Sequence, residues 1–252
     1  MEIVKFKKGK KNIYELELDN GLSLKFYDDV IVKYNLLVNK KFDDQKLKDV
    51  TDYNDSLGAY YESLKKLSTK LRSELELRNM LEKKDYSRET IDKTIAKLKK
   101  DGYLNRKLYI KSYINDVYRF NNYGPDKIRN NLNKLGFKNE EIDDYLDLDF
   151  KEKAIKIIDK KVKTNKKLSN YMLKQNISNY LINLGYRRED FIDYLQNIEI
   201  DNQEQLKKDA DILLKKYSKK YENDKILYLI KDKLYKKGYN REEIGEVLNE
   251  LL

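Results

Sequence analysis

Gly185-Tyr186-Arg187-Arg188-Glu189-Asp190-Phe191 is one of four related stretches in this chain, and the pattern that they share decides the fold. The other copies are Asp85-Tyr86-Ser87-Arg88-Glu89-Thr90-Ile91, Gly136-Phe137-Lys138-Asn139-Glu140-Glu141-Ile142 and Gly238-Tyr239-Asn240-Arg241-Glu242-Glu243-Ile244. The aromatic residue recurs at 86, 137, 186 and 239, so the steps are 51, 49 and 53 residues. A near-constant period of this length is typical of a stack of one supersecondary unit.

An apolar pair spaced i, i+4 precedes each copy. The pairs are Leu77 and Leu81, Ile128 and Leu132, Ile177 and Leu181, and Ile230 and Leu234. Because such a pair lies on one helix face, the pattern predicts a helix end, a turn and a new helix start. Glycine takes the left-handed conformation that closes the first helix, and Asp85 tolerates the same conformation. The predicted structural turn residues are Tyr86, Gly136, Phe137, Gly185, Tyr186, Gly238 and Tyr239, with the aromatic rings buried.

The residues that follow the turns differ in how well they can cap the next helix. Ser87 is a good N-cap, and Asn240 with Glu243 fits a capping box. Lys138 and Arg187 are poor caps.

The composition indicates a mainly helical protein. The chain has 252 residues, enough for one large or two modest domains, with one proline and nine glycines. Charged residues make up 39% and apolar residues 40%, and the mean hydropathy is −0.89. No apolar run approaches the length of a membrane span, and the first residues lack the apolar core of a signal peptide. With no cysteine for disulfides, we expect a cytoplasmic protein.

Residues 1–51 have a different pattern, which predicts a small β-rich subdomain. Residues 13–18 and 22–26 alternate apolar and polar side chains around Asp19-Asn20-Gly21, a hairpin turn signal. Residues 3–6 are a third expected strand. A short helix over 28–34 should cover the sheet, because so few strands cannot bury a face alone.

From residue 52 onward we expect four three-helix repeats, at 52–103, 104–148, 149–198 and 199–252, forming a curved solenoid. In the first repeat the expected helices are 57–68, 73–84 and 88–100. In the second, the middle helix should begin at Pro125, where proline loses nothing. No helical period is expected to cross the junction near Asp52, so the N-terminal subdomain should be dispensable for folding of the repeats.

The residue types argue against catalysis. Histidine and cysteine are both absent, which excludes zinc sites of the usual kind, histidine-based triads and thiol nucleophiles. No glycine-rich phosphate loop is present. Acidic pairs such as Asp143-Asp144 are better interpreted as helix-start charges. We therefore expect no catalytic residue, no metal site and no cofactor.

Basic residues are the remaining functional candidates. The net charge is +10, which indicates a polyanionic partner, although 45 lysines against 9 arginines also suit an AT-rich genome. Residues 151–167 contain eight lysines and two carboxylates. Arginine suits bidentate contacts, so arginines retained in such a chain are the stronger candidates. The predicted binding residues are Arg72, Arg78, Arg119, Lys127, Arg129, Lys134, Lys160 and Lys161, with Arg78 and Arg129 in equivalent repeat positions.

Two segments resemble the RecX family, regulators of the bacterial recombinase RecA. Residues 72–81, RSELELRNML, are similar to the family's R-S-x-x-E-L-R-x-x-L segment, and residues 123–132, YGPDKIRNNL, to its G-P-x-x-I-R-x-x-L segment. Residues 30–36, VIVKYNL, resemble the V-x-K-Y-G-L stretch of longer members with an N-terminal extension. Two departures are Asn105-Arg106 in place of paired aspartates and fewer arginines before Gly124.

The resemblance implies a non-enzymatic protein that lies in the groove of the RecA–single-stranded-DNA filament and limits its ATPase, strand exchange and repressor cleavage. The implied partners are the RecA filament, single-stranded DNA and, more weakly, double-stranded DNA. We expect a monomeric protein that does not bind a membrane. Two other classes stay open. One is a free-standing DNA- or RNA-binding protein, whose affinity would fall steeply with salt. The other is a helical-repeat protein adaptor, whose binding would barely depend on salt.

Overall fold

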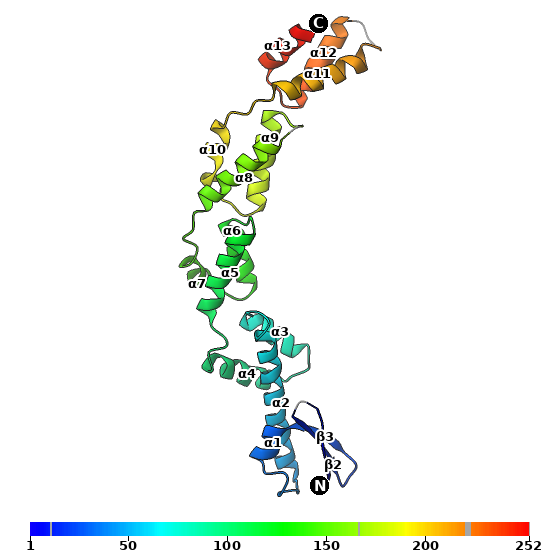
Figure 1. The fold of residues 1–252 in the computed structure, drawn as a ribbon, viewed down its shortest axis with the longest axis vertical. Helices are drawn as coiled ribbons and strands as arrows, with labels where there is room; N and C mark the ends of the chain where they lie inside the picture. Colours follow the sequence, from blue (N-terminus) through cyan, green and yellow to red (C-terminus); the bar gives the residue numbers. More distant parts are fainter. Residues whose placement is uncertain (11, 166, 220–222, 252) are drawn as a thin grey trace. The chain divides into compact units, whose positions relative to one another are not determined.

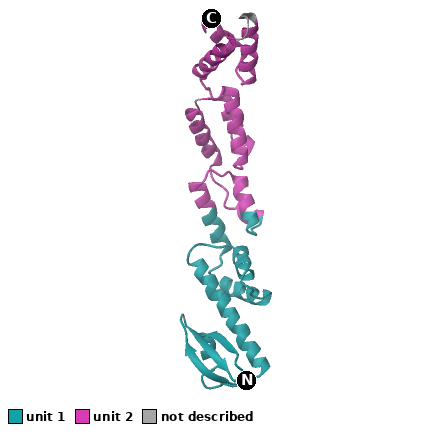
Figure 2. Ribbon diagram, turned by 90° about the vertical axis from the view of Figure 1, so that its right-hand side faces the viewer, with its two compact units in different colours: residues 1–113, 132–138 teal, residues 114–131, 139–252 magenta. Residues whose placement is uncertain are grey.

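The computed structural model describes residues 1–10, 12–165, 167–219 and 223–251. In this part of the chain thirteen α-helices follow a three-stranded antiparallel sheet (Figure 1), which confirms the mainly α fold with a small β-rich start. The chain divides into two compact units (Figure 2). Unit 1 comprises residues 1–113 and 132–138, and unit 2 comprises residues 114–131 and 139–252. The division passes through the second predicted repeat.

The N-terminal sheet has the order β1-β2-β3, with β1 at Ile3–Lys8, β2 at Ile13–Leu18 and β3 at Ser23–Tyr27. Both pairings are antiparallel, and Leu16 stands opposite Phe6 and Leu24. At the predicted turn, Gly21 has φ +82° and donates its N–H to the Leu18 carbonyl at 2.9 Å. The period-2 pattern therefore located the strands to within a residue or two.

The helix that follows the sheet corrects one prediction. After α1, Asp28–Lys33, the helix α2 runs from Asp44 to Leu67 as one element. The expected helix start at Leu57, and the expectation that no helix crosses Asp52, are therefore wrong. Val50 and Leu57 of α2 pack into the core of the sheet, whereas Ala59, two residues after Leu57, packs into the core of the first repeat. One helix serves both cores, so the argument that the N-terminal residues are dispensable no longer holds.

The first repeat continues with α3, Glu74–Glu82, and α4, Arg88–Lys100. Ser73 caps α3 through a capping box in which its hydroxyl accepts from the Glu76 N–H and the Glu76 carboxylate accepts from the Ser73 N–H. Ser87 caps α4 as predicted, accepting from the Thr90 N–H at 3.1 Å. Local capping chemistry therefore fixes where both helices begin.

The later helices also come in groups of three. They are α5 Arg106–Phe120, α6 Pro125–Lys134 and α7 Asn139–Asp143; α8 Phe150–Thr164, α9 Asn170–Asn183 and α10 Ile192–Asn197; and α11 Gln203–Tyr217, α12 Asn223–Lys236 and α13 Arg241–Leu251. The α6 helix begins at Pro125, as predicted. Arg187 provides no side-chain cap, and the chain there forms a short 3-10 turn, Arg188–Asp190, before α10. Asn240 accepts from the Glu242 N–H rather than forming the expected box with Glu243. The predicted fourth repeat includes residues 220–222 and 252, which lie outside the described residues.

The repeated motif closes the middle helix of each group in the same way. Asp85, Gly136, Gly185 and Gly238 have φ of +62°, +86°, +84° and +86°. The N–H of the aromatic residue that follows donates to a carbonyl five residues earlier, from Tyr86 to Leu81, Phe137 to Leu132, Tyr186 to Leu181 and Tyr239 to Leu234, at 3.0 to 3.3 Å. The left-handed residue donates to the carbonyl three residues earlier. This is the Schellman motif, present in all four copies.

Three of the four turn aromatics are buried as predicted. Phe137, Tyr186 and Tyr239 are almost inaccessible. Tyr86 is only partly buried, which corrects the prediction for the first repeat. Its hydroxyl end lies over Gly58 of α2, where an added Cβ would come within 2.9 Å of it. The Tyr86 ring therefore sits at the edge of the first repeat's core.

The turn of the third repeat joins directly to the middle helix of the second. The N–H groups of Gly124 and Asp126, at the start of α6, donate to the carbonyls of Leu184 and Gly185, at the end of α9, at 2.8 and 3.1 Å. Helix ends leave such groups without partners, and here two ends satisfy each other. A Cβ on Gly185 would lie 2.4 Å from the Lys127 nitrogen, and one on Gly124 would lie 2.4 Å from the Gly185 oxygen. Only glycine fits at either position.

The other two joints also bring the end of one middle helix to the start of another, and side chains make the contacts there. At the joint between the fourth and third repeats, Ser169, the N-cap of α9, donates its hydroxyl to the Lys237 carbonyl at 2.6 Å. At the joint between the second and first repeats, a Cβ on Gly136 would be 3.9 Å from the Cβ of Leu75. There Tyr109 stacks on Phe137 and donates to Glu76 at 3.3 Å. The joint at Gly124 and Gly185 is thus the closest backbone contact of the three.

Alanine at two equivalent turn glycines should have unequal effects. Gly136→Ala places a side chain at positive φ without a clash, so it should lower the free energy of unfolding by about 1–2 kcal/mol. Gly185→Ala has the same φ cost and also forces the Lys127 backbone away, which should add about 1–3 kcal/mol. Urea unfolding followed by circular dichroism measures both. Equal losses would show that the close joint is absent in solution.

Two buried tyrosines should respond differently to removal of their hydroxyl. The Tyr239 hydroxyl donates to Asp209 at 2.9 Å, whereas the Tyr186 hydroxyl has no hydrogen-bond partner among the described residues. Tyr239→Phe should therefore cost about 1–3 kcal/mol of stability, and Tyr186→Phe should cost nothing. Tyr186→Ala should cost about 3–5 kcal/mol because it empties a packed turn. A thermal melt of Tyr186→Ala that matches the parent would contradict this register.

Candidate nucleic-acid interface

Arg78 and Arg129, the arginines at equivalent repeat positions, are both held by carboxylates of their own repeat. On α3, the Arg78 Nε lies 2.9 Å from Oε1 of Glu74, and its Nη1 lies 2.6 Å from Oδ1 of Asp92 on α4. Burial raises the pKa of the Glu74 carboxyl, but hydrogen bonds from Lys99 and Arg78 outweigh it, so the pKa is below its ordinary value. The ion pairs of Arg78 therefore connect α3, the middle helix of the first repeat, to α4, its last helix.

The second repeat has the same arrangement. The Arg129 Nη1 lies 2.8 Å from Oδ1 of Asp126, and its Nη2 lies 2.9 Å from Oδ1 of Asp143 on α7. Its Nε also donates to Asp143 at 3.0 Å. The Arg78 and Arg129 side chains are 30% and 20% exposed, so they lie at the edge of the buried stripe with little free surface. We call each arginine with its partner fourteen residues later a clamp.

The internal repeats explain why the clamps form. Arg78 and Asp92, and Arg129 and Asp143, occupy the same two repeat positions. The third repeat has Ser178 and Ile192 at these positions, and the fourth has Lys231 and Gly245. The arginine and the aspartate are thus present together or replaced together. The sequence analysis noticed the arginines but missed the aspartates, although the fourteen-residue spacing was available to find them.

Two further predicted binding residues also have internal contacts. Arg72 pairs with Glu76 at 3.6 Å, beside the capping box of α3. Lys127 lies over the Tyr123 ring, 5.0 Å from its centroid. Both cations are partly buried. Both side chains therefore have partners close to them in the chain.

The remaining predicted cations differ in exposure. Arg119, Lys134 and Lys160 are exposed, and no ion pair is found for them among the described residues. Lys161 lies over the Tyr180 ring at 3.7 Å. These residues come from three different helices, α5, α6 and α8, so the structure does not gather all predicted residues into one cluster.

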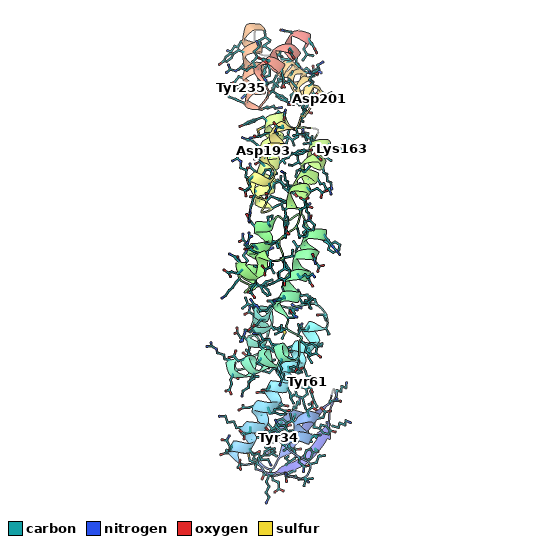
Figure 3. All side chains as sticks on the ribbon, turned by 90° about the vertical axis from the view of Figure 1, so that its left-hand side faces the viewer. Tyr34, Tyr61, Lys163, Asp193, Asp201 and Tyr235 are labelled. Carbon is teal, nitrogen blue, oxygen red and sulfur yellow. The ribbon has the colours of Figure 1, made fainter. Side chains whose placement is uncertain are left out.

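The helix α8 carries several exposed lysines. Lys156, Lys160 and Lys163 follow an i, i+4, i+7 spacing and so share one helix face; Lys163 is labelled in Figure 3. Lys156 pairs with Glu152 at 2.6 Å, while Lys160 and Lys163 have no ion pair among the residues described. Lys163 was missed as a site residue. Lys166, from the same basic segment, lies outside the described residues.

Lys153 shows that not every lysine of α8 belongs to this face. Its Nζ donates to the carbonyls of Tyr118 and Asn121, at the end of α5, the second at 2.6 Å. Burial lowers the pKa of Lys153. This lysine acts as a cap for the α5 carboxyl end, where a cation is favoured.

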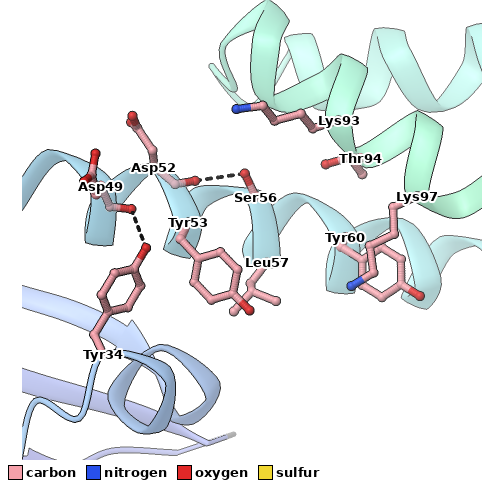
Figure 4. A pocket seen from close by; sticks show the side chains of 10 residues that line it. All are labelled: Tyr34, Asp49, Asp52, Tyr53, Ser56, Leu57, Tyr60, Lys93, Thr94 and Lys97. Carbon is pink, nitrogen blue, oxygen red and sulfur yellow. Dashed lines mark hydrogen bonds between the residues drawn. The ribbon is translucent and has the colours of Figure 1, made fainter.

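A hollow of about 440 Å³ in unit 1 has the mixed lining of an ordinary surface (Figure 4). Asp49 and Asp52 face Lys93 and Lys97 across it, and the Lys97 ammonium lies over the Tyr60 ring at 4.2 Å. Lys93 is paired with Glu89 at 2.7 Å. In the part of the chain that the structure describes, no group of three potential metal ligands occurs. The Ser56 hydroxyl in this lining donates to the backbone carbonyl of Asp52 at 2.9 Å.

Comparison with known proteins settles the family. The family model for the first three-helix domain of RecX matches residues 59–98. Over 264 aligned residues, covering 100% of both chains, the sequence is 31% identical to a regulatory protein RecX of Streptococcus agalactiae serotype Ia. The chain belongs to the RecX family. A crystal structure of a regulatory protein RecX, 22% identical, shares the fold with a TM-score of 0.62 over 75% of this chain and 96% of that one. RecX from Lactobacillus salivarius, 25% identical, matches with a TM-score of 0.53 over 58% and 99%.

In this RecX chain the segments that carried the resemblance have structural roles. Ser73 and Glu76 form the capping box, Arg78 and Arg129 form the clamps, and Gly124 forms the closest joint. Relatives are named regulatory proteins, and no described helix is long and apolar enough to span a membrane. The motif residues therefore build the repeats, and the exposed cations are the better candidates for contact with a partner.

A double-mutant cycle should measure the clamp. Arg129→Met, Asp143→Asn and the double variant should give a coupling of about 1–2 kcal/mol in the free energy of unfolding, because the guanidinium is largely buried and contacts the carboxylate twice. The matched control is Lys215 and Asp211, an exposed pair on α11, for which about 0.3–0.5 kcal/mol is expected. A clamp coupling no larger than that of the control would contradict a structural role for Arg129.

Proposed function

We propose that this chain is a non-enzymatic regulator of the RecA recombinase. It binds the filament that RecA forms on single-stranded DNA, as a monomer in the cytoplasm, and limits the filament's ATPase, strand exchange and co-protease activities. The observation that carries the proposal is the match to proteins named regulatory protein RecX along the whole chain. Regulation of RecA is the role that membership of this family implies.

The contact surface that we propose is the exposed lysine face of α8, with Arg119 of the same unit as a further exposed cation. A filament on DNA is a polyanion, and cations without carboxylate partners can bind it without first giving up an internal ion pair. Lys160 and Lys163 on α8 meet this condition, and Lys161 beside them is held over Tyr180. Such contacts strengthen binding and orient the protein without reading a sequence.

The clamps change which variants are informative. The equivalent repeat positions of Arg78 and Arg129 suggest Arg78→Glu with Arg129→Glu as a test of binding. Arg78→Glu would place a third carboxylate beside Glu74 and Asp92. Arg129→Glu would do the same beside Asp126 and Asp143. A loss of activity would then report on helix packing, so the lysines of α8 give the cleaner experiment.

The test is the DNA-dependent ATPase of the cognate RecA with and without the protein. We expect inhibition, and Lys160→Glu with Lys163→Glu should raise the concentration for half-inhibition by at least about tenfold at low salt, with a smaller difference at raised salt because the variant makes fewer salt-dependent phosphate contacts. Lys7→Glu with Lys8→Glu on β1 makes the same change in net charge and should leave it unchanged. An unaffected ATPase would contradict the proposed function, and equal effects of the two pairs would contradict the proposed surface.

A further inference from the structure

The fourth repeat has an open hollow in the place where the first two repeats have their clamps. Lys231 and Gly245 occupy the clamp positions, and both line a hollow of about 400 Å³ between α12 and α13. The ammonium group of lysine is smaller than the guanidinium group of arginine, and glycine has no side chain to fill the opposite wall. A Cβ added to Gly245 would meet nothing within 4 Å. The missing clamp therefore leaves real space, of the size that binds small chemical groups.

Two exposed aromatic rings line this hollow. Tyr228 is 72% exposed and Tyr235 is 54% exposed; Figure 3 labels Tyr235 among the side chains of the fourth repeat. They are seven residues apart on α12, so they lie on the same face, about two turns from each other. The equivalent positions in the earlier repeats hold Leu75 and Glu82, Asp126 and Asn133, and Gln175 and Ile182. Only the fourth repeat has an aromatic residue at both.

Two cations accompany the rings. Lys231 stands between the tyrosines on the same helix face, and the Arg241 guanidinium lies 5.0 Å from the Tyr235 ring centroid. Neither cation has an ion pair among the described residues. The one carboxylate in the lining, Asp232, is held by Lys236 at 2.8 Å. Two aromatic faces and two unpaired cations therefore share a hollow whose acidic group already has a partner.

We propose that this hollow, lined by Tyr228, Lys231, Tyr235 and Arg241, binds single-stranded nucleic acid, with bases stacked on the tyrosines and phosphates contacted by the two cations. Exposed aromatic rings beside cations are the means by which proteins bind single strands without sequence preference. A duplex does not fit this chemistry, because its bases are stacked on each other and offer no free face. The proposal does not rest on RecA, since the contact is with the strand itself.

The first experiment measures binding of labelled oligonucleotides of about 12 nucleotides by fluorescence anisotropy. The strands are oligo(dT), oligo(rU), an abasic strand with the same phosphates, and a duplex. Oligo(dT) should bind at least about tenfold tighter than the abasic strand, because each stacked base contributes. Comparing oligo(dT) with oligo(rU) tells whether DNA or RNA is preferred. Equal binding of oligo(dT) and the abasic strand would overturn the stacking proposal.

Substitutions then locate the contact. Tyr228→Ala with Tyr235→Ala should weaken oligo(dT) binding by at least about tenfold without changing its salt dependence. Tyr103→Ala removes an equally exposed ring, 51% accessible, from the first repeat and should have no effect. Lys231→Gln with Arg241→Gln should flatten the slope of log affinity against log salt by about 1.4, because about 0.7 is lost per phosphate contact. Full binding by the double tyrosine variant would show that the site lies elsewhere.

A closing variant separates binding from folding. Lys231→Arg with Gly245→Asp rebuilds the clamp of the first two repeats inside the hollow, where space for the aspartate exists. This variant should melt no lower than the parent and bind oligo(dT) at least about tenfold more weakly. Lys231→Arg with Gly245→Ala is the matched control, which keeps the cation, lacks the carboxylate and should still bind. If the clamped variant binds like the parent, the hollow is not the site, whatever the RecA ATPase assay shows.

Discussion

The backbone contact between the end of α9 and the start of α6 is the constraint on which the joint between the third and second repeats depends. A helix leaves unpaired carbonyls at one end and unpaired N–H groups at the other, and burying either without a partner is costly. The Schellman turn at Gly185 points the carbonyls of Leu184 and Gly185 at the amides of Gly124 and Asp126. The approach is so close that neither glycine can carry a Cβ. Pro125, which has no N–H, occupies the position between the two donors.

Charge in this protein divides between structure and contact. Arg78 and Arg129 are used inside the first two repeats, where Asp92 and Asp143 hold them. Lys160 and Lys163 of α8 have no ion pair among the described residues, and they are the cations that we propose to contact a polyanion. The fourth repeat departs from this plan because Lys231 and Gly245 replace the clamp. Without the internal ion pair, an open hollow lies beside two tyrosines. The same repeat position is therefore structural in one copy, and we propose that it binds a ligand in another.

Much of the fold was predictable because it depends on local chemistry. The turn glycines, the cap at Ser87 and the helix start at Pro125 follow from the preferences of single residues, and the repeats showed them four times. The full extent of α2, the partial burial of Tyr86 and the joint at Gly124 were not predictable, because each depends on which distant segment packs against it. Arg78 and Arg129, predicted as binding residues, have carboxylate partners inside their own repeats. Their partners were missed because a carboxylate fourteen residues away becomes a neighbour only when two helices fold together.

The account rests on the joint between α9 and α6, and hydrogen exchange of the Asp126 amide tests it most directly. Amides in the first turn of a helix ordinarily lack partners and exchange fast. In this structure the Asp126 N–H donates to the Gly185 carbonyl at 3.1 Å. Glu89, the second residue of α4 as Asp126 is of α6, is the matched control. The amides of Asp126 and Gly124 should exchange much more slowly than that of Glu89, in step with the core of unit 2. Exchange of Asp126 as fast as that of Glu89 would contradict it.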